Sequence, residues 1–143
     1  MIKDLGPATR TFAYLALGYT ILGLVSGVAY RELTRGAEVV VKTQLSTLHT
    51  HILVLGLVMS LLFMLSEAVL HLSERKFFTA FLWVYNLGVM GVATMMAVTG
   101  LRQLWGHAEH PAIAGISGLF HITLTVGLIL FFVVLLKALR NEK

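Results

Sequence analysis

QLSTLHTHILVLGLVMSLLFMLSEAVLH, residues 44–71, is an apolar run long enough to cross a lipid bilayer. A helix needs roughly 20 apolar residues to cross about 30 Å of hydrocarbon. This run nevertheless carries His49 and His51 near its start, and Glu67 and His71 at its end. Ionisable groups inside a membrane span are costly, so His49 and His51 are the first candidates for a functional site.

The composition places the whole chain in the membrane class. Hydrophobic residues make up 57% of its 143 residues and charged residues only 13%, whereas soluble domains are roughly half apolar. The net charge of +4 is modest and lies at span ends, so it indicates orientation in a bilayer and no nucleic-acid surface. The absence of cysteine excludes thiolate metal sites and covalent haem attachment.

The rest of the chain predicts three further spans and one domain, residues 1–143. The predicted spans are residues 11–30, 45–70, 77–100 and 112–136. We therefore expect an all-α protein, a bundle of four transmembrane helices joined by short connections.

Lysine and arginine near the span ends predict the orientation, because these residues are enriched on the cytoplasmic side. The side with both termini and the turn at 71–76 carries seven of them, Lys3, Arg10, Arg75, Lys76, Lys137, Arg140 and Lys143. The opposite side carries four, Arg31, Arg35, Lys42 and Arg102. We expect a multi-pass protein of a bacterial inner membrane with cytoplasmic termini.

Three histidines are predicted to lie at similar depth in the outer half of the membrane. His49 and His51 follow the start of the second span and His121 follows the start of the fourth, so their heights differ by only a few ångströms at about 1.5 Å per residue. Neutral imidazoles from two helices can take both axial positions of a porphyrin iron. Haem b is the cofactor we expect.

Helical periodicity divides these histidines between two faces. His49 shares a small, polar face with Gly56, where a porphyrin could approach the backbone, although helix packing explains this glycine equally well. His51 lies on the opposite face and is expected to point out of the bundle, toward a second subunit or a second ligand site.

Two resemblances add to this interpretation. LHTH at 48–51 resembles the second helix of subunit I in nitric oxide reductases and heme-copper oxidases, which carries an axial haem ligand. YRELT at 30–34, HTH followed by LVLG at 53–56, and ISG at 116–118 ahead of His121 are similar to an uncharacterised family of small four-span bacterial proteins.

The oxidase resemblance implies an assembly as well as a ligand. Oxidase subunits contain three four-helix arcs around a pseudo-threefold axis, so a single arc could form a homotrimer. His51 of one subunit would then face His49 of the next across a haem, and the competing pair is His49 with His121 inside one subunit. The expected activity is electron transfer or haem and gas sensing with an unknown redox partner, more a cytochrome-type carrier or sensor than a catalyst.

Two alternatives from other classes stay open. The histidines could line a path for a metal ion or proton in a channel or transporter without haem, or the chain could be a structural accessory subunit.

The outer loops hold two weaker candidate sites. Arg31 and Arg102, each just past a span end, are the expected partners of haem propionates. His107 and His110 have the i, i+3 spacing of part of a metal site, with the incidental pairing of loop histidines as the alternative.

Overall fold

The protein consists of helices alone in the part that the computed structural model describes, residues 6–36 and 42–140. In chain order these are α1 (Pro7–Leu33), α2 (Leu45–His51), the π-helix η1 (Ile52–Val58), α3 (Met59–Leu70), the short 3₁₀ helix η2 (Leu72–Glu74), α4 (Phe78–Leu104) and α5 (Pro111–Leu139). Lys3, Lys143 and residues 37–41 of the predicted first connection lie outside the described residues.

Four of these segments are long and apolar enough to cross a membrane, as the sequence predicts: α1, the continuous run Leu45–Leu70, α4 and α5. The second span has the predicted ends, while the others extend a few residues further. Arg31 and Arg102 thus belong to the last turns of α1 and α4 and not to loops. A helix can continue past the hydrocarbon because its backbone stays hydrogen-bonded in the headgroup region.

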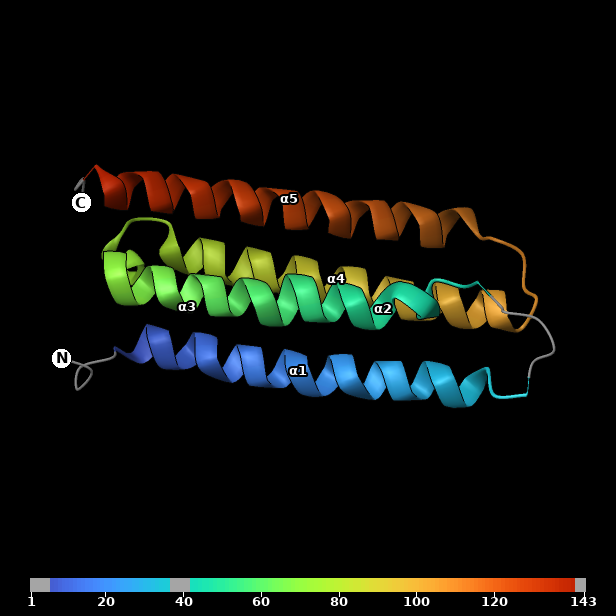
Figure 1. The fold of residues 1–143 in the computed structure, drawn as a ribbon. Coiled ribbons are helices and arrows are strands. Elements are labelled where there is room, and N and C mark those ends of the chain that lie inside the picture. Colours follow the sequence, from blue (N-terminus) through green and yellow to red (C-terminus); the bar gives the residue numbers. More distant parts are fainter. Residues whose placement is uncertain (1–5, 37–41, 141–143) are drawn as a thin grey trace.

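The four spans form an open row. The α1 helix packs along α2, η1 and α3, the second span contacts α4, and α5 packs along α4. Figure 1 shows α1 and α5 at opposite edges of this row, with the second span and α4 between them. The start of α1 and the end of α5 lie at one end of the row, here called the terminal end, and the α4–α5 connection lies at the other, the loop end.

An aromatic cluster joins all four spans nearer the terminal end. The ring of Phe63 in α3 lies 4.9 Å from Phe81 and 4.9 Å from Tyr85 of α4, and 4.6 Å from Phe131 of α5, between centroids. Phe12 of α1 completes the cluster at 5.8 Å from Phe63. These rings are buried, so this half of the row has a filled core.

A π-helix interrupts the second span directly after His51. π-Segments are rare and leave backbone groups without their usual partners, which is costly in lipid. The Tyr85 hydroxyl donates a hydrogen bond of 2.8 Å to the carbonyl oxygen of Leu55 inside this segment. Because Tyr85 comes from α4, the irregular turn is tied to the neighbouring span.

Glycines allow α4 and α5 to approach backbone to backbone. A methyl group added to Gly88 of α4 would lie 2.6 Å from the Leu124 Cα atom, and one added to Gly127 of α5 would lie 2.6 Å from the Tyr85 Cα atom. Such close contact is typical of helices packed in membranes.

Candidate functional site

The three predicted haem ligands lie in the half of the row nearer the loop end. His51 follows Leu45, whose backbone packs against Gly100 of α4, and His121 precedes Leu124, which packs against α4 at residue 88. His51 therefore lies about six residues deeper than the level of Gly100. His121 lies three residues nearer the loop end than the level of Gly88, and so about nine residues deeper than Gly100. At about 1.5 Å per residue, the two histidines differ in height by about 4.5 Å. The two imidazoles therefore lie within one helical turn of each other in depth.

His51 lies on the outward face of the second span, as its periodicity predicts. Its side chain is exposed, and so are those of Val54, Val58 and Leu62 on the same face. The ring Nδ1 lies 3.0 Å from the Thr47 carbonyl oxygen. A carbonyl oxygen only accepts hydrogen bonds, so Nδ1 carries the proton of the neutral ring. This bond fixes the tautomer and leaves Nε2 as the bare nitrogen, the state in which histidine binds a metal.

His121 repeats this arrangement on α5. Its Nδ1 lies 2.8 Å from the Ser117 carbonyl oxygen, and its ring is exposed. A methyl group added to Gly118 one turn earlier would meet nothing within 4 Å, so the α5 surface beside the ring is open. The Thr125 hydroxyl donates to the His121 carbonyl oxygen and does not hold the ring.

His49 belongs to α2, and its side chain faces α1. Its Cβ and Cγ atoms are in van der Waals contact range of a methyl group built on Gly27 of α1. Its Nε2 lies 3.3 Å from the Thr50 hydroxyl, and its buried Nδ1 has no hydrogen-bond partner among the described residues. His49 and His51 thus do face different sides of the helix.

Gly56 has a packing role in the structure. A methyl group there would lie 2.3 Å from Cγ of Tyr19. The Tyr19 ring therefore occupies the space beside Gly56 where the sequence predicts a porphyrin contact. Tyr19 also donates a 2.7 Å hydrogen bond to Asn86 of α4, which fixes its ring in that position. The structure thus shows the packing alternative for Gly56, and its contact with a cofactor stays a prediction.

The described part of the chain brings no preformed metal cluster together. Among residues 6–36 and 42–140, no three His, Cys, Asp or Glu side chains are close enough to hold a metal ion. The groove beside His51 is lined by Thr50, His51, Val54 and Leu55, which all belong to one stretch of the second span. This groove thus has a single wall.

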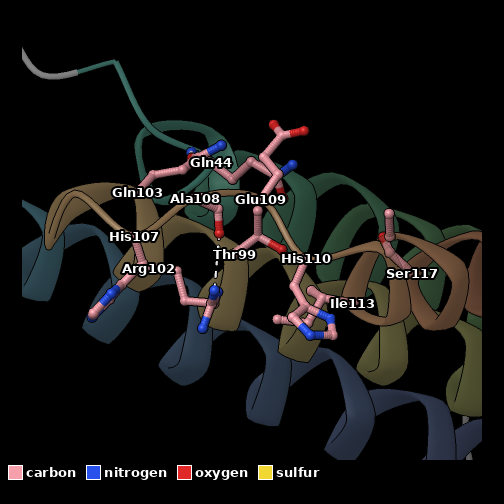
Figure 2. A pocket seen from close by; sticks show the side chains of 11 residues that line it. Gln44, Thr99, Arg102, Gln103, His107, Ala108, Glu109, His110, Ile113 and Ser117 are labelled. Carbon is pink, nitrogen blue, oxygen red and sulfur yellow. Dashed lines mark hydrogen bonds between the residues drawn. The ribbon is translucent and has the colours of Figure 1, made fainter.

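A separate pocket of about 270 Å³ lies at the loop end (Figure 2). It collects polar side chains from the start of the second span, the end of α4 and the α4–α5 connection. They include Gln44, Arg102, Gln103, His107, Glu109 and His110. Two of the predicted metal ligands and one predicted propionate partner therefore share this pocket, whereas Arg31 is exposed at the end of α1.

His110 is the N-cap of α5, and this role selects one tautomer of its neutral ring. Its Nδ1 accepts a hydrogen bond of 3.3 Å from the Ala112 N–H group, so the proton of the neutral ring sits on Nε2. A protonated Nε2 donates hydrogen bonds and does not ligate a metal. The metal site predicted for His107 and His110 would require loss of this cap.

Comparison with known proteins identifies a family. The family model described as "Protein of unknown function (DUF2871)" matches residues 9–138. The chain belongs to the DUF2871 family. The match covers all four spans of the DUF2871 chain and agrees with the predicted resemblance to an uncharacterised family. No curated protein and no solved structure matches it, so the oxidase resemblance rests on the quoted residues alone.

Two features of the DUF2871 chain are not predicted from its sequence. The π-helix has no clear sequence signal apart from a glycine inside an apolar run. The second feature is the loop-end pocket. Two of its lining residues are connected there, because the Gln44 N–H group donates a 2.8 Å hydrogen bond to the Gln103 side-chain oxygen. Only the polar character of both span ends could have indicated such a contact.

Proposed function

We propose that the DUF2871 chain binds haem b at a contact between two copies of itself, with His51 as one axial ligand, and serves electron transfer or haem and gas sensing. The observation that carries this proposal is the exposed His51 ring, whose Nδ1 is held by the Thr47 carbonyl oxygen. A bare imidazole nitrogen facing lipid loses its hydrogen bond to water without compensation. An iron ion on that nitrogen would remove this cost.

The one-walled groove beside His51 favours a contact between copies. The open row leaves both edge helices, α1 and α5, with faces that no other described span covers. A second copy could close the groove and supply the opposite ligand. The trimer remains the assembly proposed from the oxidase resemblance.

Two histidines qualify as the opposite axial ligand. His121 shares the fixed tautomer, the exposure and the approximate height of His51. His49 offers a buried nitrogen without a partner and is the ligand proposed from the oxidase resemblance. Arg31, exposed at the end of α1, stays the proposed partner for a propionate.

A spectrum of the purified protein tests the proposal. We expect a Soret band, with sharp α and β bands after reduction, that is lost in His51→Ala and in either His49→Ala or His121→Ala. His71→Ala, at the terminal end, is the matched control and should keep the spectrum. Wild-type protein that binds no haem, or a spectrum that survives His51→Ala, would contradict the proposal.

Mixed assemblies decide whether the ligands come from different copies. A His51→Ala chain and a chain lacking the opposite ligand each bind no haem alone. Co-expressed with different tags, they would form some sites with both histidines if the ligands come from two copies, so haem binding should partly return. If both ligands come from one chain, mixing restores nothing.

A path for ions through the single chain has less support. The aromatic cluster closes the interior, since Phe63 and Phe81 are 1% and 0% exposed, and His51 and His121 point away from it. Ion flux into vesicles that contain haem-free protein would favour this alternative.

A further inference from the structure

The loop-end pocket lies at the depth of lipid headgroups. The α5 helix has 29 residues and is about 43 Å long at 1.5 Å per residue, whereas the hydrocarbon core is about 30 Å thick. Part of α5 must therefore extend beyond the hydrocarbon, and the polar residues of the pocket suit its first turns to that position. Trp105 beside the pocket is 65% exposed, as expected for an interfacial tryptophan.

One side of this pocket offers positive charge and hydrogen-bond donors. Arg102 donates one 2.9 Å hydrogen bond to the Ala108 carbonyl oxygen, which uses one of the five N–H groups of its guanidinium. It pairs with no carboxylate among the described residues. His110 adds its Nε2 proton, because its Nδ1 caps α5. These donors suit an oxyanion.

The other side offers one carboxylate. Glu109 lines the same pocket, and in the described part of the chain it takes part in no ion pair. In Figure 2 its carboxylate lies on the opposite side of the view from the Arg102 guanidinium and the His110 ring. Arg102 and Glu109 thus present opposite charges to one cavity without neutralising each other.

We propose that this pocket binds a phosphoethanolamine headgroup of a membrane lipid. Its phosphate oxygens would accept hydrogen bonds from Arg102 and His110, and its primary ammonium would donate to the Glu109 carboxylate. A phosphocholine headgroup has a quaternary ammonium without N–H donors, and a phosphoglycerol headgroup carries no positive charge. The pocket therefore prefers the primary amine over both. This site does not depend on the proposed haem.

Lipid binding by the purified full-length chain tests the proposal. Native mass spectrometry would compare phosphatidylethanolamine, phosphatidylcholine and phosphatidylglycerol with identical acyl chains. We expect about fivefold tighter binding of phosphatidylethanolamine, the effect of one exposed ion pair at the upper end of its range. Equal binding of the three lipids, or tighter binding of phosphatidylglycerol, would overturn the proposal.

Two variants assign the two ends of the headgroup. Glu109→Gln should remove the preference for phosphatidylethanolamine while phosphatidylglycerol still binds, and Arg102→Gln should weaken all three lipids. Arg31→Gln removes a cation at the same end of the row but outside the pocket, so it should leave the preference unchanged. An unchanged preference in Glu109→Gln would refute the assignment of the amine.

Free phosphoethanolamine separates the lipid from a soluble ligand of the same chemistry. In excess it should displace the lipid only partly, because the acyl chains of the lipid add contacts with the bilayer-facing helices. Binding of the free compound without binding of the lipid would overturn the lipid assignment. The measurement needs no haem, so its failure leaves the haem proposal untouched.

Discussion

Replacement of Gly88 by alanine should destabilise the folded chain by separating α4 from α5. The new methyl group would lie 2.6 Å from the Leu124 Cα and N atoms, whereas ordinary van der Waals contact begins at 3.4 Å. The helices must therefore separate by about 0.8 Å at this point. A gap of this size forfeits a quarter to a half of the dispersion energy of each lost contact, and overpacking of this kind costs about 1–3 kcal/mol.

The assay is reversible unfolding in mixed micelles by titration with sodium dodecyl sulfate, followed by circular dichroism. Gly118→Ala is the matched control, because it adds the same methyl group to α5 where nothing lies within 4 Å. We expect a lower unfolding free energy for Gly88→Ala and no loss for Gly118→Ala. If both variants unfold like the wild type, the backbone-to-backbone contact described for α4 and α5 is wrong.

Two further replacements test polar contacts between segments. Tyr85→Phe removes the donor to the Leu55 carbonyl oxygen in the π-helix and should cost about 1 kcal/mol in the same titration, while Tyr14→Phe, on an exposed ring, should cost nothing measurable. Glu67→Gln should cost about 1–2 kcal/mol, because the buried Glu67 carboxylate accepts hydrogen bonds from both the N–H and the hydroxyl group of Ser73. Faster hydrogen exchange of the Ser73 amide in Glu67→Gln would accompany this loss, and unchanged exchange would contradict the role of this carboxylate as acceptor for the Ser73 N–H group.

The number and placement of the spans could be predicted because they depend on local properties. A run of apolar residues must be helical in lipid whatever surrounds it, since no water satisfies the backbone there. The face of the second span was also predictable, because a period of 3.6 residues places Gly56, Ser60 and Glu67 together, and all three are buried. The outward position of His51 follows from the same count.

The partners of these residues could not be predicted, because they depend on which helices become neighbours. The absence of a side chain at Gly56 suits a porphyrin and a packed ring equally well. The structure shows the Tyr19 ring of α1 packed there. The charge of Arg102 predicts a loop, because charge usually marks the end of a span, yet Arg102 belongs to the last turn of α4. The pocket that it lines needs three separate stretches of chain, which no periodicity reveals.

The distribution of packing along the row explains why both proposed sites lie toward the loop end. Near the terminal end, Phe63 is surrounded by rings from the other spans, and a ligand there would have to displace a filled core. Toward the loop end the exposed His51 and His121 lie on surfaces, and the half-buried Arg102 lines a pocket. Both proposed sites therefore use the less densely packed half of the row. If a bound cofactor displaced Phe63 from the aromatic cluster, this argument would fail along with the proposed haem site, whereas the loop-end pocket would be unaffected.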